Sequence, residues 1–322
     1  MSSTFSDTAN EGDSHPRLTQ LVARARAVAG AHAPAIALVY PCDALALNAA
    51  VRIAHSGIAR PLLVGPTELI ARAADEAGVD MRAFEVVATS DAAPQAALRA
   101  TTLAREGVVS ALMKGALHTD ELMSAVVNKA TGLRGDTRIS HAFVFDLPRY
   151  PKLLALADCV VNIAPDLKTK RDILSNALAL LRQLGIAQPK VGIVAAVETV
   201  NPAIVATLDA QALVALAAEG AWPGAIVEGP MGFDNAISAQ AARIKKMDSQ
   251  VAGDADLLLM PDLNAGNMLY KSFNYIGGGD CAGLVLGAKV PIVLTSRADS
   301  LQSRLASVAL AVLASQPVAT VS

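Results

Sequence analysis

The chain combines 322 residues with a nearly neutral charge, because 29 acidic side chains are balanced by 27 basic ones. This balance excludes the extended basic surface expected of a protein that binds nucleic acid or an anionic membrane. Hydrophobic residues make up 53% and aromatic residues only 3%, so much of the apolar content is alanine, which suits many helices packed on sheets.

Short apolar runs alternate with helical patterns along the first third of the chain. Strands are predicted over 35–40, 61–64, 84–88 and 108–113. Helices are predicted over 17–29, 43–55, 67–77 and 92–105. This βα alternation at short spacing is typical of a mainly parallel sheet with helices on its faces. The polar first 15 residues do not resemble a signal peptide, and we expect them to be flexible.

The remainder of the chain continues with longer helices and further buried strands. Helices are predicted over 119–130, 166–184, 202–220 and 235–247, with a buried helix near the C-terminus. Strands are predicted over 139–147, 158–163, 190–197, 225–228, 255–260, 284–286 and 290–294. The regular alternation changes near 135–150. We therefore expect two domains, one made of 1–140 plus 297–322 and the other of 141–296.

Five polar loops each follow an apolar strand. They cover residues 113–121, 195–202, 227–238, 260–267 and 294–300. Because ligands of open α/β sheets bind outside the carboxyl ends of the strands, we expect these loops to converge on one site. In the last loop, Ser296 and Arg297 stand where a strand ends and a helical pattern begins. A hydroxyl and a guanidinium beside free N–H groups suit an anion.

Each of the other loop residues has a structural alternative. Lys114 either contacts a phosphate or carbonyl group or is a solvated loop lysine, and His118 is either a general base or a helix cap. Gly266 stands at a helix start that offers an anion or amide site. Arg134 and Arg138 either clamp a phosphate or lie in a solvated loop. The expected substrate-binding residues are Lys114, His118, Thr119, Arg138, Glu198, Asp262, Gly266 and Asn267.

Several common catalytic signatures are missing from the sequence. No HExxH motif occurs, and no phosphate-binding loop or dinucleotide-type glycine motif follows a strand. No GxSxG motif is present either, which disfavours a serine hydrolase. We therefore expect neither a metal site nor a tightly bound cofactor. Three cysteines without metal-like spacing fit the cytoplasm better than a disulfide framework.

Six segments resemble, in their order, those of the phosphate acetyl/butyryl-transferase family. They are MKGALHTDELM, NIAPDLKTKRDI, AAVETVNPAI, GPMGFDNAIS, PDLNAGNMLYK and PIVLTSRADS. The closer likeness is to the phosphate butyryltransferase branch. The resemblance implies that acyl-CoA and phosphate are converted to acyl phosphate and CoA. It also implies two α/β/α domains with a cleft between them, as in isocitrate and isopropylmalate dehydrogenases.

The resemblance further implies roles for single residues. Ser296 and Arg297 correspond to the Ser-Arg pair at the family's site. The acetyltransferase branch has an arginine where this chain has Met123, and an aspartate, proposed as the thiol base, where this chain has Ser303. Asp299 is the local candidate for that base. The resemblance also implies CoA and phosphate as substrates rather than cofactors, and a homodimer or higher homo-oligomer.

The chemistry needs only modest help from the protein. A thiol such as that of CoA has a pKa of about 8.5 by analogy with cysteine, so a thiolate is accessible near neutral pH. Direct attack on the acyl phosphate carbonyl needs no covalent enzyme intermediate. Two alternatives remain open, which are a nicotinamide-dependent dehydrogenase of the same fold and a catalytically silent acyl-CoA-binding subunit.

Overall fold

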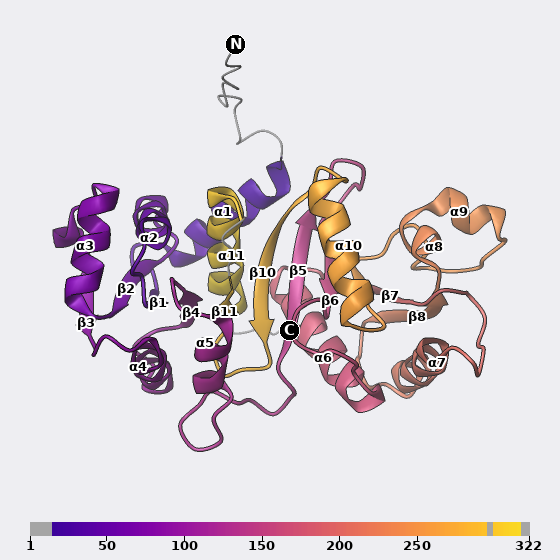
Figure 1. The fold of residues 1–322 in the computed structure, drawn as a ribbon. Coiled ribbons are helices and arrows are strands. Elements are labelled where there is room, and N and C mark those ends of the chain that lie inside the picture. Colours follow the sequence, from indigo (N-terminus) through magenta and orange to yellow (C-terminus); the bar gives the residue numbers. More distant parts are fainter. Residues whose placement is uncertain (1–14, 295–298, 317–322) are drawn as a thin grey trace, which may run out of the picture.

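The computed structural model describes residues 15–294 and 299–316, and these form a mixed α/β fold around one continuous sheet. The strands occur in the spatial order β3-β2-β1-β4-β11-β10-β5-β6-β9-β7-β8. Figure 1 shows them running from β3 at the left to β8 at the right, with β10 and β5 in the middle. Their bounds are β1 Ala35–Val39, β2 Arg60–Gly65, β3 Glu85–Ala88, β4 Ala111–Lys114, β5 Ser140–Asp146, β6 Leu154–Ala157, β7 Lys190–Val194, β8 Ile226–Met231, β9 Leu257–Leu259, β10 Asp280–Leu286 and β11 Ile292–Val293.

The sheet consists of two parallel blocks that run in opposite directions. Strands β3, β2, β1, β4 and β11 are parallel to one another, and so are β6, β9, β7 and β8. Between the blocks, the steps from β11 to β10, from β10 to β5 and from β5 to β6 are all antiparallel. The carboxyl ends of β4 and β11 therefore lie at the opposite edge from those of β7, β8 and β9. The predicted convergence of all five loops is wrong for this reason.

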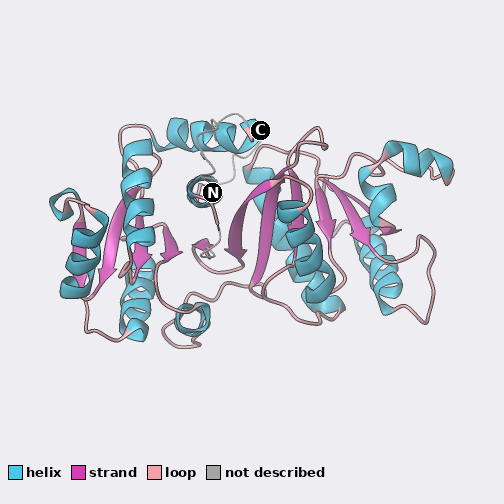
Figure 2. Cartoon of the chain, turned by 45° about the horizontal axis from the view of Figure 1, so that its top comes forward, coloured by secondary structure: helices cyan, strands magenta, loops and turns pink. Residues whose placement is uncertain are grey.

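Helices cover both faces of the sheet (Figure 2). One face packs against α1, α2, α3, α6, α7 and α11. The other face packs against α4 and α5 over the first block, and against α8 and α10 over the second. The helices are α1 Pro16–Ala29, α2 Ala44–Ser56, α3 Thr67–Ala77, α4 Ala93–Arg105, α5 Thr119–Val126, α6 Leu167–Gln183, α7 Val205–Ala218, α8 Phe233–Ile237, α9 Ala239–Ile244, α10 Leu263–Tyr275 and α11 Leu301–Ala314.

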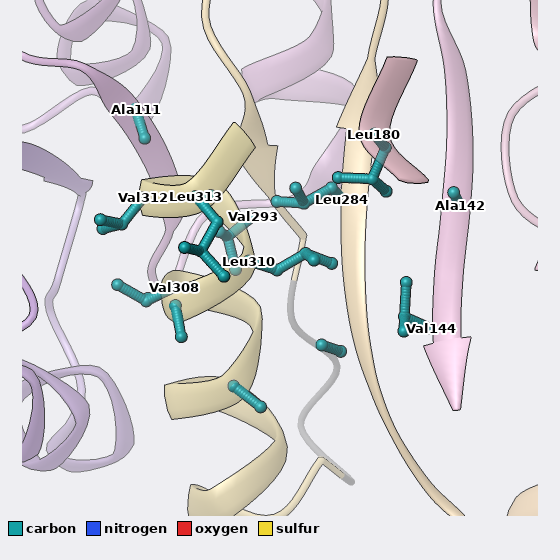
Figure 3. Packing of buried hydrophobic residues seen from close by; sticks show 14 of the residues in the cluster. Ala111, Ala142, Val144, Leu180, Leu284, Val293, Val308, Leu310, Val312 and Leu313 are labelled. Atoms are coloured by element: carbon teal, nitrogen blue, oxygen red, sulfur yellow. The ribbon is translucent and has the colours of Figure 1, made fainter. Parts of the chain in front are cut away.

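The predicted C-terminal helix is confirmed as α11, which is buried on all sides. Every residue of 306–313 is buried, as expected of a helix that is apolar all round. Leu310 of α11 points toward β10, and Leu284 of β10 belongs to the same core (Figure 3). α11 also packs against α1 and α2 of the N-terminal segment. The division into 1–140 plus 297–322 and 141–296 stays a prediction. No described helix is long and apolar enough to cross a membrane.

Several predicted element boundaries are wrong. The strand expected over 158–163 is not present, and the strand β6 lies just before it, at Leu154–Ala157. That segment was predicted to be a connection because it contains two prolines. The expected helix 235–247 is divided at Ser238, whose side chain accepts the N–H of Ala241 and starts α9. The helix predicted over 119–130 ends at Val126, and the strand predicted over 290–294 has only two residues.

Candidate active site

A cleft of about 520 Å³ opens on the face of the sheet that carries α5 and α10. In Figure 1, α5 lies to the left of β10 and α10 lies to the right of β5. The cleft is lined from β4, α5, β5, α10, β10 and the approach to α11. Its lining residues include Lys114, Thr119, His141, Phe143, Val160, Tyr270, Lys271, Asn274, Asp280, Leu294, Asp299 and Ser300.

Gly283 on β10 lies against two of the rings that line the cleft. Its register partner on β5 is Phe143, and His141 stands two residues earlier on the same strand. A Cβ atom at position 283 would lie 2.9 Å from Cε1 of Phe143 and 3.1 Å from Cε1 of His141. Only glycine therefore lets both rings lie over β10 without displacement.

His141 is a polar side chain that sequence reasoning missed. It is 1% exposed, and its Nδ1 atom has no hydrogen-bond partner. Burial lowers the pKa of His141 to about 4, even though the nearby Asp158 carboxylate favours the charged form. The imidazole is therefore neutral at pH 7. The signal in the sequence was a histidine inside a mostly apolar predicted strand.

The opposite wall of the cleft is built by α10. The ring of Tyr270 stacks on Phe143 with a centroid separation of 4.2 Å and an interplanar angle of 2°. Burial raises the pKa of the Tyr270 hydroxyl, so this group stays protonated at neutral pH. This side of the cleft is thus aromatic and carries the neutral hydroxyl group of Tyr270.

Three predicted substrate-binding residues hold α10 in place instead of lining the cleft. Asp262 caps the helix by accepting the N–H of Ala265 at 2.9 Å. Asn267 donates from Nδ2 to the carbonyl of Cys159 at 3.3 Å. A Cβ atom at Gly266 would lie 2.5 Å from the carbonyl oxygen of Asp158, so the helix approaches this loop closely.

Lys114 and Thr119 line the cleft from the first block. Nζ of Lys114 lies 3.3 Å from the carbonyl oxygen of Gly115 and 3.2 Å from that of Leu117, which holds the ammonium group at the end of β4. The exposed His118 caps α5, and its backbone N–H donates to Oε2 of Glu121 at 2.7 Å. The structure therefore places His118 as the cap of α5, one residue before Thr119.

Ser296 and Arg297 lie outside the described residues. On either side of them, Leu294 and Asp299 both line the cleft. Ser300 follows as the cap of α11, and its hydroxyl donates to Oδ2 of Asp280 at 3.0 Å. Of the described carboxylates that line the cleft, Asp299 is therefore the nearest in sequence to Ser296 and Arg297.

The side chain of Ser303 belongs to the core. It is 5% exposed, and its hydroxyl donates to the carbonyl of Cys281 at 2.5 Å. Position 303 is therefore unsuited to supply the base that the acetyltransferase branch carries there.

Replacing Ser303 with aspartate is expected to destabilise the fold by about 3 kcal/mol or more without raising turnover, because a carboxylate would be buried against a carbonyl oxygen. Chemical denaturation and steady-state rates measure both effects. Ser303→Ala serves as the control, with an expected loss of about 1 kcal/mol. A stable, faster Ser303→Asp enzyme would contradict this account.

A second cavity of about 860 Å³ adjoins the cleft, and we call it the basic cavity after its three basic side chains, although three aspartates also line it. The two share Thr119, Val160 and Leu294. The basic side chains lining this cavity are Arg134, Arg138 and Lys168, and the acidic ones are Asp136, Asp166 and Asp172.

Arg138 is oriented by its neighbours in this basic cavity. Its Nε donates to Oδ1 of Asn162 at 3.0 Å, and its backbone N–H donates to Oδ2 of Asp172 at 3.0 Å. Arg134 donates from Nε to the carbonyl of Val127. Both guanidinium groups are thus positioned by the chain itself.

The loop between the cleft and the basic cavity is organised by Asp158. This buried carboxylate accepts the backbone N–H groups of Val160 at 2.8 Å and Val161 at 3.0 Å, and Nδ2 of Asn162 at 2.7 Å. It also accepts the backbone N–H of His141 at 3.2 Å, not the imidazole. One carboxylate therefore fixes the walls of both cavities.

Glu198 lies with the ends of β7 and β8, outside the residues that line the cleft. Its Oε1 atom accepts Nδ2 of Asn235 at 2.5 Å and also pairs with Lys245, which lowers the pKa of the carboxyl group. Over residues 15–294 and 299–316, no group of three or more His, Cys, Asp or Glu side chains is placed to hold a metal ion.

Comparisons with known proteins agree with one another. The family model "Phosphate acetyl/butaryl transferase" matches residues 90–312. A phosphate acetyltransferase of Rhizobium meliloti is 49% identical over 288 residues, covering 89% of this chain and 91% of that protein. A phosphate butyryltransferase of Clostridium acetobutylicum is 37% identical over 278 residues, covering 86% and 92%. The solved structure of a branched-chain phosphotransacylase from Enterococcus faecalis V583 aligns with a TM-score of 0.78 at 27% identity, covering 88% of this chain and 99% of that one.

Proposed function

The chain belongs to the phosphate acetyl/butyryl transferase family, and from this premise we propose that it transfers a short acyl group directly between CoA and phosphate in a ternary complex. The observation that carries the proposal is the pair of adjoining cavities. One is lined by Lys114 and Asp299, and the other by three basic side chains together with three aspartates. Two anionic substrates require such an arrangement of positive groups.

The reacting centre is assigned to the cleft beside Lys114 and Asp299, with Ser296 and Arg297 as its proposed catalytic residues. In the direction of acyl-CoA formation, the CoA thiol gives its proton to Asp299, and the sulfur attacks the carbonyl carbon of the acyl phosphate. The tetrahedral oxyanion receives hydrogen bonds from Ser296 and backbone N–H groups, each worth about 2.7–4 kcal/mol. The C–O bond to phosphate then breaks. Arg297 and Lys114 hold the departing phosphate.

The basic cavity is assigned to the phosphates of CoA. Its opening toward the cleft at Thr119 and Val160 lets the thiol end reach the reacting centre. Arg138, already oriented by Asn162, supplies a fixed guanidinium that matches the geometry of a phosphate. The side chains assigned to CoA in this cavity are Arg134, Arg138 and Lys168.

Replacing Arg138 with methionine is expected to raise the KM for CoA about tenfold and to leave the KM for acyl phosphate unchanged. Methionine keeps part of the apolar stem and removes the charge. Initial rates against each substrate measure the effect, with the exposed Arg149→Met as the control. An equal rise in both constants would argue that the cavity is not specific for CoA.

The order of chemical steps is tested by initial-rate kinetics and exchange. A ternary mechanism predicts intersecting double-reciprocal lines and no incorporation of labelled phosphate into acyl phosphate when CoA is absent. Parallel lines together with such exchange would indicate a covalent acyl-enzyme and would overturn direct transfer. The dehydrogenase alternative is not favoured, because the similar proteins are named as phosphate acyltransferases.

We further propose that the enzyme acts in the cytoplasm as a homodimer or higher homo-oligomer. Free thiols at Cys42, Cys159 and Cys281 support a reducing environment. Exposed apolar side chains on and after α10 support self-association, since Met268 is 64% exposed and Ile276 is 86% exposed. Sedimentation of the purified chain tests the oligomeric state.

A further inference from the structure

We propose that His141 binds the amide group of the CoA arm that is nearest to the sulfur, a role that rests on the proposed function. His141 lines the cleft together with Lys114 and Asp299, which are assigned to the reaction. It is also a buried side chain whose Nδ1 atom has no partner in the protein.

The strand register places His141 between the reacting centre and the basic cavity. Phe143 pairs with Gly283, which is level with Leu294 and the end of β4, whereas His141 pairs with Val285, level with Ile292. Arg138 lies three residues before His141 on the same segment. A CoA molecule that extends between the two cavities along Thr119, Val160 and Leu294 is therefore proposed to pass the imidazole, which lines the cleft.

The distances suit the pantetheine arm of CoA. Phe143 follows Arg138 by five residues, the last of them on β5, so their Cα atoms are at most roughly 18 Å apart, which is the length scale of this arm between its phosphate and its sulfur. His141 stands two residues, or roughly 7 Å, from the level of Phe143. The amide closest to the sulfur lies a few bonds from it and reaches this depth.

The chemistry of the imidazole matches an amide. A neutral imidazole carries one N–H donor and one acceptor nitrogen, and an amide offers one C=O acceptor and one N–H donor. The two groups can therefore pair in either tautomer. Burial keeps His141 neutral at pH 7, because it lowers the pKa to about 4. The Asp158 carboxylate binds backbone N–H groups and the Asn162 amide, and does not occupy the ring.

The unpaired nitrogen also distinguishes a binding role from a structural one. A buried polar atom without a partner costs the folded protein free energy, which an apolar replacement of the same shape recovers. The His141→Phe variant is therefore expected to be at least as thermostable as the wild type, although it binds CoA less tightly. A structural histidine would give the opposite result, with lower stability and unchanged affinity for CoA.

The test is calorimetric titration of the purified chain with CoA. His141→Phe is expected to raise the Kd for CoA about tenfold and to leave the KM for acyl phosphate unchanged. His141→Asn, which keeps a polar atom near the position of Nδ1, is expected to recover part of the affinity. The inhibition constant of pantetheine as a competitive inhibitor should rise by the same factor in His141→Phe. In Arg138→Met, the binding of CoA should weaken, and the binding of pantetheine should not change.

Three results would overturn the assignment. They are an unchanged Kd in both folded His141 variants, a loss of kcat without a change in Kd, and a loss confined to CoA with pantetheine unaffected. The second variant also keeps the test decisive if His141→Phe does not fold. Failure of the wild-type chain to bind CoA would instead reject the proposed function, which separates the two outcomes.

Discussion

Replacing Arg297 with alanine is expected to lower kcat/KM for acyl phosphate by about 100- to 1000-fold, because a charged contact to the transferred phosphate would be lost in the transition state. Binding of CoA should change little, since its phosphates are assigned to the separate basic cavity. Steady-state rates with acyl phosphate and titration with CoA measure the two effects.

Two further substitutions make the Arg297 experiment specific. Arg297→Lys keeps the charge but loses the paired N–H groups, so it should recover only part of the activity. Arg243→Ala removes an exposed arginine on α9 and should leave the rate unchanged. Wild-type kinetics in a folded Arg297→Ala variant would remove this residue from the mechanism.

Replacing Lys114 with methionine is expected to lower kcat/KM by about 10- to 100-fold, because a hydrogen bond to a charged group contributes about 1.5–3 kcal/mol. The ammonium group is held between two backbone carbonyls and lines the cleft, so it is oriented before substrate arrives. The loss should appear with acyl phosphate and with phosphate in the two directions of the reaction.

The control for Lys114 is a lysine of the same chemical type on the surface. Lys129→Met removes one positive charge at an exposed position after α5 and should leave kcat/KM within about twofold of wild type, as ordinary surface substitutions do. The dependence of kcat/KM on salt concentration should be the same in the wild type and in Lys129→Met. It should be shallower in Lys114→Met. Equal losses in Lys114→Met and Lys129→Met would assign the effect to net charge alone.

Local patterns in the sequence predicted most of the fold. The alternation of short apolar runs with helical patterns predicted the strands and helices of the first block. The βα spacing correctly indicated an α/β fold with a largely parallel sheet. The misplacement of β6 shows the limit of this reasoning. Pro148 and Pro151 suggested a connection, but the strand starts just beyond them and is paired on both sides.

The arrangement of the site depends on long-range pairing that local patterns do not contain. Three antiparallel steps reverse the second block, so Glu198 and the residues of α10 that were predicted from strand ends do not join Lys114 in the cleft. His141 was missed for a related reason. Its proposed role depends on its position in the cleft beside α5 and α10, which only the tertiary fold creates. Ser296 and Arg297 remain predictions that rest on the family and on their flanking residues.

The most direct test is to mix the purified chain with acyl-CoA substrates of two to six carbons, with and without phosphate, and to follow free CoA with a thiol dye. The account predicts phosphate-dependent release of one CoA for each acyl phosphate formed, with at least one acyl length in this range turned over efficiently. Absence of phosphate-dependent release for every acyl-CoA in the panel would contradict it.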